Sequence, residues 1–133
     1  VMQQLISEIN TFCNIYLISI SIIVQFVVYP SFKNYNTNQF KSFHSDYTTK
    51  MLYIVGPVMT VELLCCVYLL YVDLPSVLFS SLLLSIVWVL TFAMIVPIHN
   101  RLNNNFEQND HRKLLRLNGL RTLAWILKFT VIV

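Results

Sequence analysis

The sequence predicts an all-α integral membrane protein, an up-and-down four-helix bundle that forms a single domain over residues 1–133. Three observations support this fold class. Residues 9–32 and 74–100 carry no charged side chain, and residues 51–72 carry only Glu62. A helix needs roughly 20 apolar residues to cross about 30 Å of hydrocarbon. The hydrophobic fraction of 56% and the charged fraction of 11% also depart from soluble averages in the membrane direction. Finally, 133 residues accommodate four crossings and three short connections, with no separate soluble domain.

The first two crossings are predicted at about residues 5–29 and 51–72. The first should end at Pro30, because a proline commonly stops a helix. The second contains Pro57, whose ring and missing N–H should kink the helix. On the N-terminal side of Pro57, four large apolar side chains recur with helical spacing: Phe40, Phe43, Tyr47 and Met51. They indicate an amphipathic helix that leads into the second crossing.

The third and fourth crossings are predicted at about residues 76–97 and 111–133. Pro97 should end the third crossing, as Pro30 ends the first. Asn109 or Asp110 is expected to cap the fourth helix. Basic residues interrupt this last apolar stretch: Arg116, Arg121 and Lys128.

The distribution of basic residues predicts which side of the membrane each connection faces. The first and third connections, with the start of the fourth helix, carry seven: Lys33, Lys41, Lys50, Arg101, Arg112, Lys113 and Arg116. The N-terminal residues 1–8 and the turn at 73–75 carry none. Cytoplasmic loops are enriched in Lys and Arg. We therefore expect a multi-pass protein of the cell (inner) membrane, with loops one and three cytoplasmic and both termini outside.

Two charged residues fall inside predicted crossings and are expected to meet. A carboxylate at mid-membrane costs roughly 2.5–3.5 kcal/mol on insertion scales, so Glu62 should face the interior of the bundle and have a partner. Arg121 enters from the same side and reaches a similar predicted depth, which predicts a Glu62–Arg121 ion pair. The pair either pins two helices together or belongs to a ligand or proton site. In a further alternative, Glu62 is protonated and unpaired.

Other polar residues form stripes along the predicted helices. The first helix carries Ser21, Gln25 and Tyr29, the third Ser81, Ser85 and Trp88, and the fourth Asn118, Arg121, Trp125 and Lys128. Such side chains often only join helices inside a membrane, and Lys128 can extend to the outer interface. Five residues should nevertheless converge in the cytoplasmic half: Gln25, Tyr29, Glu62, Asn118 and Arg121. We interpret this convergence as a candidate ligand-binding site.

The histidines and cysteines offer little support for a metal site. His44, His99 and His111 all map to the cytoplasmic side, where they are expected near the mouth of one cavity. Their spacing matches no metal-binding pattern, and Cys13, Cys65 and Cys66 read as free apolar thiols, so no metal is predicted. Ligation of a haem by His44 and His99 is an alternative. Contacts with loop carbonyls or lipid phosphates are the simpler interpretation. No nucleic-acid signature is present.

Several short motifs together resemble a known family. The motifs are Tyr29-Pro30, Phe43-His44-x-x-Tyr47, Gly56-Pro57-x-Met59-x-x-Glu62, Pro97-x-His99-x-x-Leu102 and Asn118-x-x-Arg121-Thr122. Between about residues 25 and 125 they resemble small four-helix bacterial membrane proteins of the anthrone-oxygenase-like family, largely a domain of unknown function. That family more often carries asparagine at the position of His99. The resemblance implies an aromatic or lipid-like ligand, and oxidation of polycyclic aromatic anthrones without a metal or flavin.

These observations leave different classes of function open. In the first, the bundle binds or oxidises a hydrophobic aromatic or lipid-like molecule, with His44, His99, Glu62 and Arg121 as catalytic candidates. A histidine would act as general base, and Arg121 would stabilise a phenolate or enolate oxygen. In the second, the chain is a non-catalytic accessory or scaffold subunit of a membrane complex, with Trp125 and Lys128 facing a partner. A homo-oligomer that forms a small channel is a third alternative.

Overall fold

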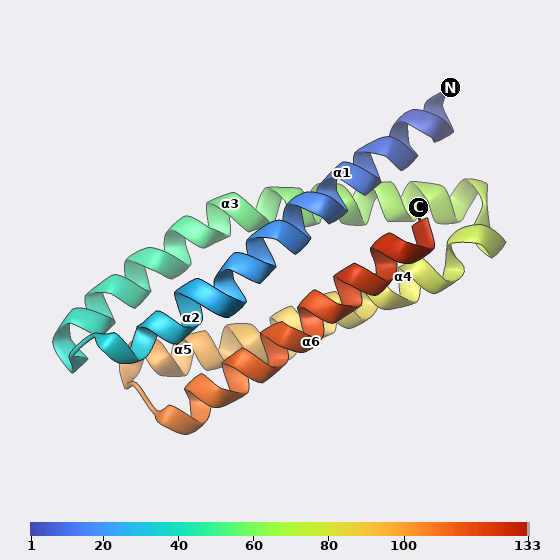
Figure 1. Ribbon diagram of the computed structural model, residues 1–133. Coiled ribbons are helices and arrows are strands. Elements are labelled where there is room, and N and C mark those ends of the chain that lie inside the picture. The colour runs from blue at the N-terminus through green and yellow to red at the C-terminus, as the bar shows by residue number, and fades with distance from the viewer. Residues whose placement is uncertain (133) are drawn as a thin grey trace.

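The structure is a computed structural model that describes residues 1–132, and it is an all-α four-helix bundle. Four antiparallel rods run up and down, as Figure 1 shows. The first rod is α1 (Met2–Ile23), the π-helical turn η1 (Val24–Val28), α2 (Tyr29–Ser31) and the 3-10 turn η2 (Phe32–Asn34). The second rod is α3 (Thr37–Val72). The third is α4 (Leu74–Val89), the π-helical turn η3 (Leu90–Ile95) and α5 (Val96–Asn104), and the fourth is α6 (Gln108–Ile132).

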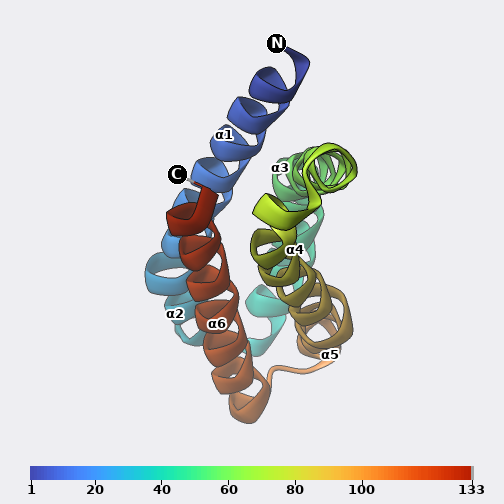
Figure 2. The same cartoon turned by 90° about the vertical axis from the view of Figure 1, so that its right-hand side faces the viewer.

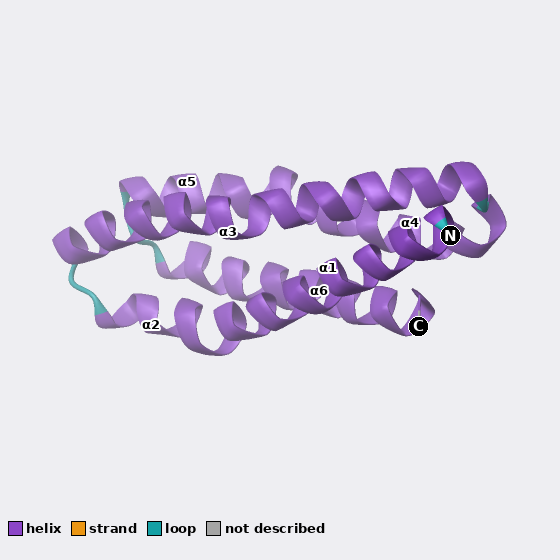
Figure 3. Cartoon of the chain, turned by 90° about the horizontal axis from the view of Figure 1, so that it is seen from above, coloured by secondary structure: helices purple, strands orange, loops and turns teal. Residues whose placement is uncertain are grey.

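The rods pack as a ring of four. The helix α1 contacts α3 and α6, and α4 contacts the same two helices from the other side. Seen from the end of the bundle, α1 and α6 lie on one side and α3 and α4 on the other (Figure 2). The first connection, around Tyr35, and the third, around Phe106, lie at the same end of the bundle (Figure 3). This arrangement is the one expected from four crossings.

Two predicted helix ends are wrong, because neither Pro30 nor Pro97 stops its rod. The first rod continues to Asn34 and the third to Asn104. In both cases a π-helical turn comes directly before the proline-containing helix. A π turn holds one more residue than an α turn. The wider turn accommodates the proline ring, which would otherwise clash with the carbonyl four residues earlier.

The predicted lead-in and the second crossing form one uninterrupted helix, α3, of 36 residues. Its helical character is as predicted, but residue 51 does not mark a helix start. Asn36 caps it, with the Asn36 side chain accepting a hydrogen bond from Gln39 N at 2.8 Å. At 1.5 Å per residue the helix is roughly 54 Å long, well beyond about 30 Å of hydrocarbon. Pro57 lies inside α3 without ending it.

The predicted start of the fourth helix is also corrected. The helix α6 begins at Gln108, before both predicted caps. Asp110 lies in its first turn and accepts a hydrogen bond from Arg101 Nη2 at 3.1 Å, so its carboxylate serves an ion pair and not a cap.

Three of the four rods fit a membrane protein. By length and composition, the described segments Met2–Asn34, Thr37–Val72 and Leu74–Asn104 could each cross a membrane. Large apolar side chains point outward from all three, including Phe26, Tyr53 and Phe92. The rod α6 is less apolar on average, because it carries charged residues such as Arg112, Lys113 and Arg116 near its start and a polar stripe that faces the bundle interior. Its exposed side chains near the C-terminal end are mainly leucine, isoleucine and valine, such as Leu123 and Val131.

Candidate functional site

A cavity of about 370 Å³ lies between the rods at the end where α2, α3 and α5 meet. Its volume is in the range of small-molecule sites, which are mostly apolar with a few polar groups. The polar side chains at its wall include those of Tyr29, Tyr47, Thr91, His99 and Arg121. The cavity reaches the surface between α3 and η3, where the lining residues Leu52 and Phe92 are 66% and 56% exposed. A second hollow of about 770 Å³ is lined by one end of α1 alone, between Val1 and Phe12, and is an open surface.

A row of hydrogen bonds leads from this cavity to the third connection. Tyr29 Oη lies 3.1 Å from His99 Nε2, and His99 Nδ1 lies 2.8 Å from His44 Nε2. His44 Nδ1 lies 2.5 Å from Asn103 Oδ1. The row joins α2, α5 and α3, so residues distant in the sequence meet at one place. The π turns η1 and η3 come just before Tyr29 and Pro97, and they set the rotation at which Tyr29 and His99 face each other.

Aromatic rings hold the imidazoles in place. Phe32 is 1% exposed, and its ring lies edge-on to His44 at 5.3 Å and to Tyr47 at 5.7 Å between centroids. Phe40 stacks on His44 at 5.1 Å. His44 is 0% exposed. The rings therefore shield His44 from water and restrict its imidazole to one arrangement, whereas His99 is partly exposed at the cavity wall.

The third histidine does not join this pair. His111 Nε2 donates a hydrogen bond to the carbonyl oxygen of Tyr29 at 2.6 Å. Its ring lies 6.0 Å from that of Phe32. Of the three histidines expected to meet at one cavity mouth, His44 and His99 do contact each other, but only His99 lines the cavity. His111 makes a buried contact to a backbone carbonyl.

Arg121 faces the same cavity from α6. Its Nη2 donates to Asn118 Oδ1 at 2.6 Å, and Nη1 donates to Thr91 Oγ1 at 3.3 Å. Its guanidinium carbon lies 5.2 Å from the centre of the Trp125 ring. The Nε atom is buried and has no hydrogen-bond partner in the described chain. Within residues 1–132, no carboxylate pairs with Arg121.

Asn118 connects Arg121 to the first rod. Asn118 Nδ2 donates to Gln25 Oε1 at 2.9 Å and to the carbonyl of Ser21 at 3.3 Å. Ser21 and Thr122 also share a hydrogen bond through their hydroxyls. The structure thus brings Gln25, Asn118 and Arg121 together and places Tyr29 on the wall of the same cavity.

The predicted Glu62–Arg121 ion pair is wrong. Glu62 Oε2 pairs instead with Lys128 Nζ at 2.8 Å, and both side chains are 0% exposed. The error follows from the length of α3. Glu62 lies 25 residues after Thr37, or roughly 37 Å along the helix, whereas Arg121 lies only 13 residues, roughly 20 Å, into α6. Lys128, roughly 30 Å into α6, lies nearer to that depth and makes the contact.

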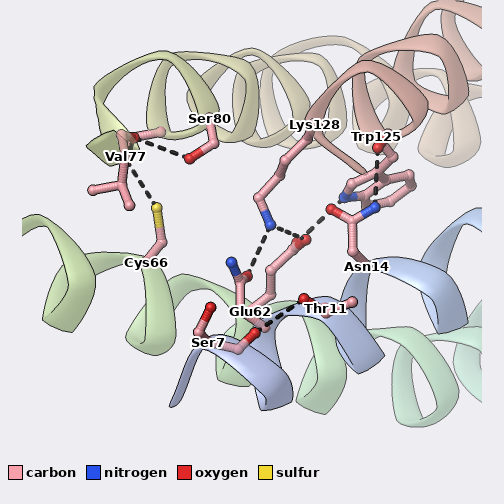
Figure 4. A network of polar contacts seen from close by, with 11 residues as sticks. Ser7, Thr11, Asn14, Glu62, Cys66, Val77, Ser80, Trp125 and Lys128 are labelled. Carbon is pink, nitrogen blue, oxygen red and sulfur yellow. Dashed lines mark hydrogen bonds and ion pairs between the residues drawn. The ribbon is translucent and has the colours of Figure 1, made fainter. Parts of the chain in front are cut away.

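One interpretation of the sequence placed the ammonium group of Lys128 at the outer membrane interface, and the structure contradicts it. Figure 4 shows the lysine of α6 and the glutamate of α3 pointing toward each other inside the bundle. Lys128 Nζ also donates to Asn10 Oδ1 at 2.9 Å, and Trp125 Nε1 donates to Glu62 Oε1 at 3.2 Å. Asn14 Nδ2 donates to the carbonyl of Trp125 at 3.0 Å. Trp125 therefore lies between this buried network and the cavity.

Sequence reasoning missed several members of the two networks. Asn10 and Asn14 are buried four residues apart on one face of α1, and that spacing was a usable signal. Lys128 shared a helix face with Asn118 and Arg121, which also indicated an inward orientation. Thr91 and Asn103 carried no signal, because their roles depend on contacts between rods. The polar stripe of the third rod lies elsewhere: Ser81 contacts Cys66 Sγ at 3.1 Å.

The arrangement does not suit a metal or a haem. In the described chain, no three His, Cys, Asp or Glu side chains gather as a metal site would require. The facing nitrogens of His44 and His99 are hydrogen-bonded to each other at 2.8 Å. A haem between two histidine ligands needs both rings to point at an iron from opposite sides, and this geometry leaves no such gap.

Comparisons with protein-family models, with curated proteins and with solved structures found no match.

Proposed function

We propose that the protein is a multi-pass membrane protein that binds a hydrophobic, aromatic or lipid-like molecule in the cavity, with an oxygen of the ligand facing Arg121. We place it in the cell (inner) membrane, with four crossings. The end that holds the cavity and the basic connections faces the cytoplasm, because Lys and Arg are enriched in cytoplasmic loops. An aromatic ligand agrees with the resemblance to the anthrone-oxygenase-like family.

The unpaired guanidinium of Arg121 is the observation that carries this proposal. A buried charge is costly unless it is paired and hydrogen-bonded. Glu62, the nearest predicted partner, is occupied by Lys128. Arg121 keeps one buried N–H without an acceptor, and it lines an otherwise mainly apolar cavity. A phenolic, enolic or carboxylic oxygen in the cavity would supply the missing acceptor, while the rest of the ligand covers the apolar wall.

The position of the opening supports entry from the bilayer. Besides the exposed polar residues Thr49 and Asn100, the cavity edge exposes three apolar side chains: Leu52, Phe92 and Val96. In a membrane these side chains face acyl chains and not water. A molecule dissolved in the cytoplasmic leaflet could therefore enter sideways between α3 and η3, without leaving the hydrocarbon.

The proposal is tested by titrating the protein in lipid nanodiscs with 2-naphthol and with naphthalene, which lacks the oxygen. Fluorescence anisotropy of the probe measures binding after subtraction of empty nanodiscs. Arg121→Gln should weaken 2-naphthol binding by roughly tenfold to a hundredfold, because a hydrogen bond to a charged group contributes about 1.5–3 kcal/mol. Naphthalene binding should change little.

Arg116→Gln is the matched control, because Arg116 is an exposed arginine on the same helix. It should leave the affinity for both probes unchanged. Circular dichroism verifies that each variant keeps its helical content. Equal 2-naphthol affinity in the wild type and Arg121→Gln, or no saturable binding above that of empty nanodiscs, would contradict the proposal.

A further inference from the structure

The hydrogen bonds between Tyr29 and Asn103 have a direction. Asn103 Oδ1 can only accept, so His44 Nδ1 carries the proton of the bond they share. A neutral imidazole has one N–H, so His44 Nε2 accepts from His99 Nδ1. His99 Nε2 is then free of hydrogen and accepts from the hydroxyl of Tyr29. Every donor in the row points away from the cavity and toward the third connection.

The surroundings of the row include one positive charge and two tyrosines. The titratable and charged groups that face the pair are Tyr29 from α2, Tyr47 from α3 and Arg121 from α6. Among residues 1–132, no carboxylate hydrogen-bonds to either imidazole. Arg121 and His99 line the same cavity, so the positive charge of Arg121 opposes a second positive charge on His99. An anion bound beside Arg121 would remove this opposition.

We propose that the row Tyr29–His99–His44–Asn103 is a proton-transfer path, which takes the proton of a weakly acidic aromatic hydroxyl bound in the cavity. This inference rests on the proposed function, because the ligand occupies the same cavity. It narrows the ligand class to phenols and comparable enols, and it assigns Tyr29 and His99 a role beyond packing.

The transfer is balanced without any other reactant. The ligand O–H bond breaks and its proton binds the oxygen of Tyr29, while the proton of Tyr29 moves to His99 Nε2. The ligand becomes a phenolate beside the Arg121 guanidinium, and His99 becomes an imidazolium. The Nδ1 proton of His99 then moves to His44 Nε2, which carries the positive charge one residue further from Arg121. Asn103, which is partly exposed next to Asn104, holds the far end of the row at the connection.

The probe for this path is 2-naphthol, which is strongly acidic in its excited state. Bound in an apolar cavity without an acceptor, excited naphthol emits as the neutral molecule. If an acceptor is within hydrogen-bond reach, the proton leaves during the excited-state lifetime and the emission is that of naphtholate. The wild-type protein in nanodiscs, excited where tryptophan does not absorb, should therefore emit mainly as naphtholate.

The variants interrupt the row at successive links. Tyr29→Phe and His99→Gln should each lower the ratio of naphtholate to naphthol emission by about tenfold or more, within the range of general acid–base effects. His44→Gln should also lower it, because the positive charge can no longer leave His99. His111→Gln is the matched control: His111 is buried at the same end and contacts the backbone carbonyl of Tyr29, but no side chain that carries a proton in the row. It should keep the wild-type ratio.

The affinity for 2-methoxynaphthalene, which has no acidic proton, distinguishes a loss of proton transfer from a loss of binding. If every variant binds this ether as the wild type does, the cavity is intact and the emission reports on the row alone. Neutral emission from 2-naphthol bound to the wild type would overturn the path and leave the binding function standing. Unchanged naphtholate emission in His99→Gln or His44→Gln would also overturn it. No saturable binding of either probe would overturn the proposed function itself, and the path with it.

Discussion

Replacing Lys128 by methionine removes the ammonium group that neutralises Glu62 and keeps a side chain of similar length. The wild-type pair is separated by 2.8 Å, and neither residue is exposed to solvent. After the substitution, Glu62 retains the hydrogen bond from Trp125 Nε1 and loses its cation. Asn10 Oδ1 loses its donor as well. We expect Lys128→Met to destabilise the bundle strongly.

The magnitude follows from the distance and the burial. At 2.8 Å and an effective dielectric constant of about 20, the attraction between unit charges is roughly 6 kcal/mol. Breaking a buried pair by removing one partner typically costs about 3–5 kcal/mol. We expect a loss of that size in the free energy of unfolding.

The assay is reversible unfolding in mixed micelles with increasing sodium dodecyl sulfate, followed by circular dichroism. The matched control is Lys113→Met, an exposed lysine of the same helix, which should change the free energy of unfolding by less than about 0.5 kcal/mol. Adding Glu62→Gln to Lys128→Met should recover about 2 kcal/mol, because an amide replaces the unpaired charge.

Two results would refute this reasoning. A loss below about 1 kcal/mol in Lys128→Met would show that the pair contributes little to stability. A double variant less stable than Lys128→Met alone would show that the cost does not come from an unpaired carboxylate, and that Glu62 stabilises the bundle through its other contact.

Two further predictions concern the packing and the orientation of the bundle. Gly119→Ala should stabilise the protein by about 0.5–1 kcal/mol in the same assay, because the new Cβ meets Gln25 Nε2 at an ordinary 3.6 Å and alanine favours helix; a loss would mean that the rods must approach more closely. In intact spheroplasts, a membrane-impermeant maleimide should label Asp73→Cys, whereas Asn105→Cys should react only after lysis; the reverse pattern would invert the proposed orientation.

The sequence predicted the four-helix architecture because it depends on local composition. The apolar stretches at residues 9–32, 51–72 and 74–100 each suffice for a long helix, and the spacing of Phe40 and Tyr47 predicted the helical lead-in. The helix ends were predicted less well. Prolines usually terminate helices, but the π turns that precede Pro30 and Pro97 accommodate their rings. No pattern in the sequence predicted those turns.

The sequence also determined which residues face inward. Asn118, Arg121, Trp125 and Lys128 share one face of α6, because a helix repeats every 3.6 residues, and the structure turns that face toward the interior. What only the tertiary structure decided is which residue of another rod meets each of them. That choice depends on the axial register between helices, which the lengths of the lead-in and the turns set. The partner of Glu62 lies seven residues, roughly 10 Å, further along α6 than predicted. Glu62 therefore pairs with Lys128, and Arg121 faces the cavity.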